Sequence, residues 1–297
     1  METTFDIPGK VKLAAGVNGF PRFEVTTALA EAHVYLYGAH VTHFQAAGEK
    51  PLLFLSRHAV FQAGKAIRGG VPVIFPWFGG RAADPKSPAH GFARTQTWTP
   101  ESVVETAEGA IVITLRLEPT DASRAVAWAE DWVLRLRVTI AKTLTMEVEI
   151  ENRGTAAIQC EDALHTYFTV EDVRATEVYG LEGAEYLDKT DEMRRKRQGD
   201  GPVVFQGEVD RTYVNTTSNC VIAGSGAGRR IVIEKTNSRS AVTWNPGSER
   251  VKTFADLGDE EWPEFVCVET GNIADNTLEI APGTTHITKT VLRTEPL

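Results

Sequence analysis

Apolar and polar residues alternate through the middle of the chain and predict antiparallel β-strands. Between Ile111 and Glu118 every second residue is an isoleucine or a leucine, and segments 132–140 and 144–150 repeat the pattern. A period of two with one apolar face is typical of strands in a sheet with one buried and one solvated face. Because only residues 141–143 separate the last two segments, we expect them to form a hairpin.

Shorter segments of the same kind cover much of the remaining chain. Residues 34–45 predict two strands with a bend at Gly38, residues 51–56 a buried strand, and the charged segment 188–201 an exposed loop. Residues 122–128 are long enough only for a helical turn. Further strands are expected at 164–170, 175–181, 203–206, 211–214, 220–223, 231–235, 241–244, 264–269 and 287–292.

Taken together, these elements predict an all-β protein. Short strands spaced roughly ten residues apart, with almost no long amphipathic helix, are typical of a large β-sandwich of antiparallel sheets. The length of 297 residues would allow two domains. All-β folds of this size are often single, however, and no linker or repeat divides the sequence. We therefore expect one domain over residues 1–297.

Two of the predicted strands carry residues suited to acid/base chemistry. His165 lies in the sequence LHTYFTV, where a strand would place Tyr167 beside it on the same face. Glu269 ends an apolar strand just before a Gly-Asn turn. An imidazole and a carboxylate on rigid strands are the acid and the base that a proton-transfer site needs. For His165 alone, the alternative is a hydrogen-bonded histidine of the core.

Two stretches rich in glycine, proline and aromatic residues, 67–80 and 88–98, predict irregular loops that line a site. They carry Arg68, His90 and Arg94. A guanidinium matches the oxygens of phosphate or carboxylate, so two arginines on neighbouring loops indicate an anion site. The alternative is a well-packed structural loop with Arg68 on its rim.

The composition narrows the range of functions. The chain has 31 basic and 40 acidic residues, a formal net charge of −9, and no basic block interleaved with aromatic residues, so nucleic-acid binding is not expected. No apolar stretch is long enough to span a membrane, and the N-terminus lacks a signal sequence. Three cysteines without CxxC spacing indicate reduced, buried thiols. We expect a cytoplasmic protein, and a monomer because nothing demands an oligomer.

Other kinds of catalytic site find less support. His40 and His43 would lie on opposite faces of a strand, which does not suit a shared metal ion. No serine lies in a GxSxG motif, and Cys267 lies in an apolar strand that disfavours a thiolate. The glycine pair 69–70 lacks the spacing of a nucleotide-binding loop. A glycosidase would need a second carboxylate, for which Asp210 is the contender, its alternative being a turn cap. We expect neither metal nor cofactor.

Seven short motifs occur in the order found in one enzyme family. Together they resemble the glucose-6-phosphate 1-epimerases, which are the hexose-6-phosphate mutarotases of the aldose 1-epimerase superfamily. The resemblance runs from about Ile67 to Asn272 and, more loosely, through both ends. The motifs are IRGGVPVIFPWFG (67–79), HGFAR (90–94), LHTYF (164–168), GLEGAEYLDK (180–189), VDRTY (209–213), WNPG (244–247) and VCVETGN (266–272).

The resemblance implies a galactose-mutarotase-like β-supersandwich and an isomerase that interconverts the α and β anomers of a hexose 6-phosphate, with glucose 6-phosphate as the first candidate. It implies that His165 is the general acid toward the ring oxygen and Glu269 the general base toward the anomeric hydroxyl. Two alternatives stay open. One is a non-catalytic sugar-phosphate binding or regulatory protein on the same fold, and the other is a mutarotase for unphosphorylated aldoses.

The resemblance also implies which residues bind the substrate. Arg68 and Arg94 would bind the phosphate. His90 would lie near the sugar, close to the ring oxygen or a hydroxyl, and Asp210 would form hydrogen bonds with sugar hydroxyls.

Two positions depart from the family pattern. Many relatives have a glutamine immediately before HGFAR and another within the segment that here reads FPWF. This chain has Ala89 and Trp77 instead. These changes bear on hydroxyl recognition, and hence on which hexose phosphate is preferred, and they leave the acid/base pair intact.

Overall fold

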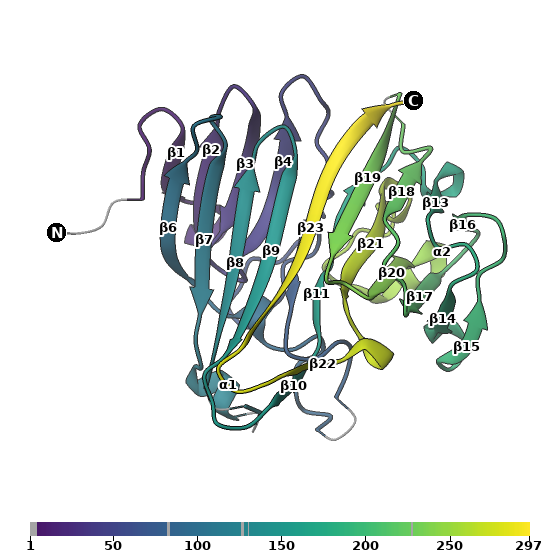
Figure 1. The fold of residues 1–297 in the computed structure, drawn as a ribbon. Helices are drawn as coiled ribbons and strands as arrows, with labels where there is room; N and C mark the ends of the chain where they lie inside the picture. The colour runs from purple at the N-terminus through teal and green to yellow at the C-terminus, as the bar shows by residue number, and fades with distance from the viewer. Residues whose placement is uncertain (1–4, 82–83, 126–127, 130, 227) are drawn as a thin grey trace.

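The protein is built from antiparallel sheets, two of them large (Figure 1). The structure is a computed structural model that describes residues 5–81, 84–125, 128–129, 131–226 and 228–297. The largest sheet has nine strands. In spatial order they are β16 (Val203–Val204), β13 (Glu177–Tyr179), β18 (Cys220–Ala223), β19 (Arg229–Thr236), β23 (Thr285–Pro296), β9 (Leu144–Asn152), β8 (Trp132–Ile140), β7 (Ile111–Leu117) and β6 (Thr99–Glu105).

The alternating segments of the sequence form one half of this sheet. Strands β8 and β9 make the predicted hairpin, with Trp132 opposite Asn152 and Ile140 opposite Leu144. Their predicted inward residues, together with those of β7, are buried. The alternation therefore identified both the strands and the face that packs on the core.

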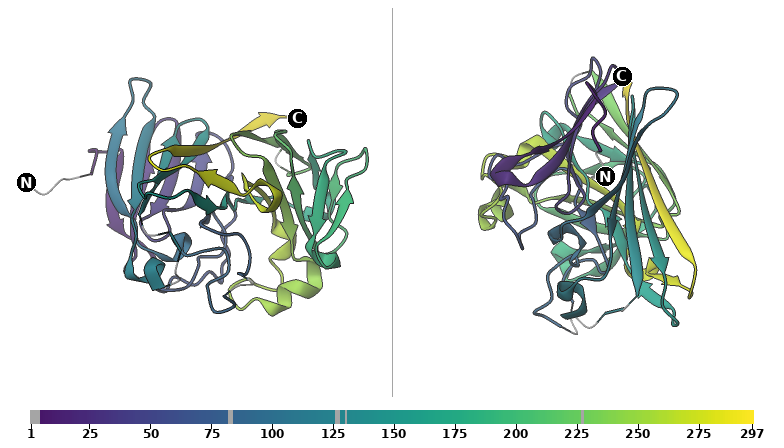
Figure 2. Two further views of the ribbon diagram at one scale, coloured as in Figure 1. Left: turned by 60° about the horizontal axis from the view of Figure 1, so that its bottom comes forward. Right: turned by 90° about the vertical axis from the view of Figure 1, so that its left-hand side faces the viewer.

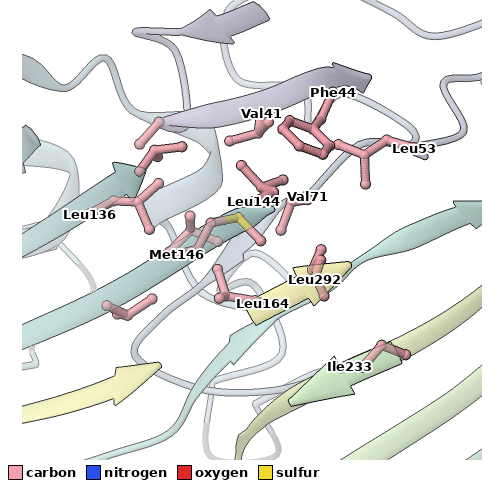
Figure 3. Packing of buried hydrophobic residues seen from close by; sticks show 14 of the residues in the cluster. Val41, Phe44, Leu53, Val71, Leu136, Leu144, Met146, Leu164, Ile233 and Leu292 are labelled. Atoms are coloured by element: carbon pink, nitrogen blue, oxygen red, sulfur yellow. The ribbon is translucent and has the colours of Figure 1, made fainter. Parts of the chain in front are cut away.

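A four-stranded sheet lies behind β6–β9 in Figure 1, and Figure 2 shows the same two layers from the side. Side chains from β4, β8, β9, β23 and the connecting loops fill the core between the layers (Figure 3). A two-stranded sheet of β10 (Ile158–Cys160) and β22 (Leu278–Ile280) is separate. The four strands are β1 (Val11–Ala15), β2 (Pro21–Thr26), β3 (Ala30–Tyr35) and β4 (His40–Ala46).

The second large sheet, of eight strands, carries most of the residues considered below. Strand β12 (Tyr167–Thr169) also belongs to it and pairs with β21 beside β11. The other strands, in spatial order, are β15 (Arg194–Arg197), β14 (Glu185–Asp188), β17 (Val209–Val214), β20 (Ser240–Asn245), β21 (Phe265–Asn272), β11 (Asp162–Leu164) and β5 (Val73–Ile74).

All helices among the described residues are short. The predicted helical turn at 122–128 corresponds to α1 (Asp121–Ala125), and residues 126–127 lie outside the described part. The others are α2 (Gly247–Arg250) and the 3₁₀ helices η1 (Val17–Gly19), η2 (Ala93–Thr95), η3 (Val173–Ala175), η4 (Lys189–Asp191), η5 (Val251–Thr253), η6 (Trp262–Glu264) and η7 (Ala274–Asn276).

Two predictions about the acid/base strands need correction. The segment 164–170 is not one strand, because the chain leaves the ladder at His165 and Thr166 between β11 and β12. Glu269 does not end a strand, because β21 continues through Gly271 and Asn272, which pair with β11. Gly271 does not form a turn but lets β21 and β11 pack closely. A Cβ at this position would lie 2.1 Å from the carbonyl oxygen of Asp162.

Three further predictions were wrong or incomplete. The charged segment 188–201 is not only a loop, since β15 pairs with β14 inside it. The pattern hid this strand because its sequence, RRKR, has no apolar face and lies at the edge of the sheet. Residues 51–56 are mostly buried but form only isolated bridges, at Leu53 and Leu55. Besides β15, the strands that were not predicted are β1, β2, β5, β6, β10, β14 and β22.

The all-β fold of antiparallel sheets is confirmed. That the chain is one domain stays a prediction, which the nine-stranded sheet supports because it joins strands from residue 99 to residue 296. Within the described ranges, the structure contains no helix long and apolar enough to cross a membrane.

We predict that Gly271→Ala destabilises the protein by about 1–3 kcal/mol, because the new methyl group would meet the backbone of both Asp162 and Ala163. Chemical denaturation would measure the loss. Gly199→Ala is the matched control, since a Cβ there meets nothing within 4 Å, and it should change the free energy of unfolding by less than about 0.5 kcal/mol. Equal stability of the two variants would contradict the prediction.

Candidate active site

The six residues singled out in the sequence all line one cavity of about 390 Å³. Asp210 and Glu269 lie on strands of the eight-stranded sheet, and His165 lies between β11 and β12. Arg94 lies on η2, and the other two residues come from loops that cover the sheet. The cavity therefore brings together segments that are up to 200 residues apart. The six are Arg68, His90, Arg94, His165, Asp210 and Glu269.

Strand pairing explains why the floor of the cavity is continuous. Asp210 lies opposite Trp244, Trp244 opposite Cys267, and Cys267 opposite Tyr167. Glu269 follows Cys267 by two residues on the same strand and so projects from the same face. The pairing thus places an aspartate, two aromatic rings and the glutamate on one face of the sheet.

His165 and Glu269 are in direct contact. The break between β11 and β12 turns the imidazole onto the ring of Tyr167, with the ring centroids 4.9 Å apart and the planes at 11°. Its Nε2 lies 3.3 Å from Oε1 of Glu269, whose side chain is 1% exposed. His165 Nδ1 and Glu269 Oε2 are buried and have no hydrogen-bond partner among the described residues.

Burial acts in opposite directions on the two groups, because it disfavours each charged form. It lowers the pKa of His165 well below its usual value, and the positive charges of Arg94 and Arg68 add to this effect. Burial raises the pKa of Glu269 well above its usual value, against the opposing charges of Lys189 and Arg94. Burial therefore shifts the pair toward the form in which both groups are neutral.

Arg68 is held by several partners. Its Nη2 and Nε donate to Oδ1 of Asp256 at 3.0 and 3.2 Å, and its Nη1 donates to the hydroxyl of Tyr167 at 3.1 Å. The guanidinium carbon lies 4.8 Å from the centre of the Phe254 ring. The next residue, Gly69, has φ +106° and packs against the backbone at Phe54, a conformation and a close contact that favour glycine.

Arg94 contrasts with Arg68, because no described carboxylate forms an ion pair with it. Its Nη2 donates to the carbonyl oxygen of Ala89 at 2.9 Å, and its Nε is buried without a hydrogen-bond partner. Burial lowers the pKa of Arg94 to about 10. A half-buried guanidinium without a carboxylate partner can donate charge-assisted hydrogen bonds to an anionic ligand.

His90 lies beside the pair formed by His165 and Glu269. Its backbone has φ +64°, and its N–H donates to the carbonyl oxygen of Gly79 at 2.7 Å. Its ring centre lies 5.8 Å from that of His165 and 4.6 Å from that of Phe78. Burial, followed by the charge of Arg94, lowers its pKa well below the usual value. His90 is thus a neutral imidazole facing the cavity.

Asp210 is paired with a residue that the sequence reasoning did not single out. Lys189 Nζ lies 3.1 Å from Oδ1 of Asp210 and 4.6 Å from the centre of the Phe78 ring. Burial raises the pKa of Asp210, and the ammonium of Lys189 opposes this. The available signal was the YLDK motif, but the lysine lay in a segment interpreted as an exposed loop.

Further residues line the cavity, of which only Tyr167 was expected beside His165 from the sequence. Tyr167 and Trp244 form the floor, while Phe254, Asp256 and Arg250 come from the segment after the WNPG motif. Aromatic side chains offer flat apolar surface for the C–H face of a sugar ring. Nothing in the local pattern distinguished these residues from ordinary core or surface residues.

The two departures from the family pattern differ in position. Ala89 lines the cavity, and its carbonyl oxygen holds Arg94. Trp77 is not among the lining residues; its Nε1 donates to the carbonyl oxygen of Pro88 at 2.9 Å, which supports the loop from behind. His40 is also structural, with Nε2 2.7 Å from the carbonyl oxygen of Gly69. The three cysteines are free and buried, as predicted.

Comparison with known proteins shows similarity over most of the chain. The aldose 1-epimerase family model matches residues 21–293. An Escherichia coli K12 protein named "Putative glucose-6-phosphate 1-epimerase" is 37% identical over 81% of this chain and 79% of its own length. A protein of the same name from Cenchrus ciliaris is 33% identical over 85% and 78%. The crystal structure of a "putative mutarotase (YeaD)" from Salmonella typhimurium superposes with a TM-score of 0.87 at 28% identity, covering 97% of each chain.

An antiparallel β-supersandwich with an imidazole and a carboxylate in contact at the floor of a sugar-sized cavity defines a mutarotase-like enzyme. The chain belongs to the aldose 1-epimerase family.

We predict that His165 stays neutral as the pH falls through 6.5, the ordinary histidine value, because burial and the charge of Arg94 disfavour the imidazolium. Imidazole ¹⁵N NMR would follow the titration, with His165→Asn assigning the signal among the seven histidines. Arg94→Met should move the titration upward. A His165 signal that titrates at or above 6.5 in the folded protein would contradict this account.

Proposed function

We propose that this chain is a mutarotase that interconverts the α and β anomers of a hexose 6-phosphate, with glucose 6-phosphate as the first candidate. The observation that carries the reaction type is the buried contact between His165 and Glu269. The observation that carries the phosphate is Arg94, a half-buried cation in the same cavity that no described carboxylate neutralises.

The reaction requires two proton transfers, and the substrate neither gains nor loses a proton overall. Glu269, as carboxylate, takes the proton of the anomeric hydroxyl, while His165, as imidazolium, protonates the ring oxygen and the bond from C1 to that oxygen breaks. Rotation about C1–C2 presents the other face of the aldehyde, and both transfers then reverse. A positioned acid or base of this kind contributes about 10²–10⁴-fold in rate.

The electrostatics of the pair suit this sequence. Ring opening converts Glu269 carboxylate and His165 imidazolium into a carboxylic acid and a neutral imidazole, and the net charge of the pair stays the same. Because burial disfavours both charged groups, the site stabilises the pair in the ring-opened complex. The direct contact between the two side chains also lets the shared proton return between them.

The two arginines should contribute unequally to phosphate binding. Arg94 would gain its anionic partner only from the substrate, whereas Arg68 already has Asp256 and Tyr167. His90 and Asp210 would hydrogen-bond the sugar hydroxyls, and the rings of Tyr167 and Trp244 would support it from below. The cytoplasmic location and the monomeric state stay predictions.

We predict that Arg94→Met lowers kcat/KM for glucose 6-phosphate by about 10- to 100-fold, mainly through KM, because a charge-assisted hydrogen bond contributes about 1.5–3 kcal/mol. Arg68→Ala should have the same direction and a smaller effect. Glucose has no phosphate and should lose much less than glucose 6-phosphate in Arg94→Met, its remaining change coming from the shifted pKa values of His165 and Glu269. Exchange NMR between the anomers would measure both substrates.

The same measurement separates the alternatives. Equal loss for glucose and glucose 6-phosphate would contradict the phosphate assignment and favour a mutarotase of unphosphorylated aldoses. No exchange above buffer for either sugar with the wild-type protein, combined with binding of glucose 6-phosphate, would favour a non-catalytic sugar-phosphate binding protein.

A further inference from the structure

Lys189 is placed in the cavity by structure that the sequence pattern did not reveal. Strand β14 ends at Asp188, which lies opposite Arg211 on β17, so one further step along the ladder brings Lys189 opposite Asp210. The carboxylate of Asp188 accepts from the backbone N–H and the hydroxyl of Thr190, at 3.0 and 2.6 Å. It also accepts from Lys196 on β15 at 2.8 Å. The β14–β15 hairpin thus fixes the turn that carries Lys189.

The ammonium of Lys189 lies within a group of carboxylates and imidazoles. Asp210 and Glu269 project from the same sheet face with one strand, β20, between theirs. Adjacent strands are roughly 4.8 Å apart, so the two carboxylates are close enough to repel each other when both are charged. The ammonium lies 3.1 Å from Oδ1 of Asp210, with 27% of its side chain exposed. Packing of Lys189 over the Phe78 ring restricts its position further.

The other charged groups of the cavity are arranged differently. Arg68 is bound to Asp256, and Arg250 lies 4.0 Å from Glu208. Arg94 donates to a backbone carbonyl. Each of these arginines comes from a loop, η2 or α2, whereas Lys189 begins η4 directly after β14, beside Asp210 on β17.

We propose that Lys189 is a positioning residue of the proton-transfer site: its ammonium holds Asp210 toward the sugar and supplies the positive charge that stabilises the carboxylate form of Glu269. This inference rests on the proposed function and extends it to a residue with no role assigned above. Asp210 accepts a hydrogen bond from one sugar hydroxyl. The positive charge of Lys189 reduces the repulsion between the carboxylates of Asp210 and Glu269. The cation thereby offsets the cost of forming a second carboxylate in a buried site.

The directions in which the charge of Lys189 shifts the pKa values of Glu269 and His165 support this role. After burial, the charge of Lys189 has the largest effect on the pKa of Glu269, which it lowers, and it also lowers the pKa of His165. Losing the ammonium should therefore raise both pKa values together. A change in local structure alone would reduce activity without moving the two limbs of a pH profile in the same direction.

The test compares Lys189→Met, Lys189→Arg and the wild-type enzyme in anomer exchange of glucose 6-phosphate as a function of pH. We expect Lys189→Met to lower kcat at pH 7 by about 10- to 100-fold, as for loss of a charge-assisted hydrogen bond, and to move both limbs to higher pH. Lys189→Arg should restore most of kcat and the position of the profile. Lys252→Met is the matched control, because that lysine is exposed, pairs with Glu249 and does not line the cavity.

A second readout keeps this proposal separate from the proposed function. The ¹⁵N titration of His165 should move upward in Lys189→Met and stay in place in Lys252→Met, whether or not the wild-type enzyme exchanges anomers. An unmoved His165 titration or unmoved limbs in Lys189→Met would overturn the role of Lys189. Absence of exchange in the wild type would overturn the proposed function, and the titration would then decide the role of Lys189 alone.

Discussion

The site depends on one contact, between an imidazole and a carboxylate that are both removed from water. His165 Nε2 and Glu269 Oε1 are 3.3 Å apart in a setting where neither charged form is favoured alone. The surrounding structure serves this contact. The interrupted ladder between β11 and β12 turns the imidazole toward the cavity, and Gly271 lets β11 pack closely against β21. The stacked ring of Tyr167 restricts the orientation of the imidazole.

Charge is distributed around this contact in two ways. On one side, Arg68 has a carboxylate partner, whereas the half-buried Arg94 has none among the described residues. On the other side, Lys189 is paired with Asp210 close to Glu269. In the proposed function, the phosphate of the substrate would bind Arg94 and its hydroxyls would bind Asp210. The two ends of the proposed substrate would then meet opposite charges in the cavity.

Prediction from the sequence was most accurate for strands with one buried face, because burial of one face makes apolar and polar residues alternate. The hairpin of β8 and β9 and the all-β fold followed from alternation, and the motifs placed all six site residues in one cavity. Prediction was poor for segments in which the order of apolar and polar residues does not reveal a buried face. Strand β15, with the sequence RRKR, has no apolar face, so Lys189 was assigned to a loop. The interruption of the ladder at His165 and the continuation of β21 past Glu269 depend on which strands pair, and a single segment does not encode that pairing.

The most direct test of the central claim is a double-mutant cycle on the pair, measured as anomer exchange of glucose 6-phosphate in the wild type, His165→Asn, Glu269→Gln and the double variant. If the two groups pass one proton as a unit, each single change should lower kcat by about 10²–10⁴-fold, and the double variant should be little worse than the poorer single one. Losses that multiply, or a single variant that keeps wild-type exchange, would contradict the account.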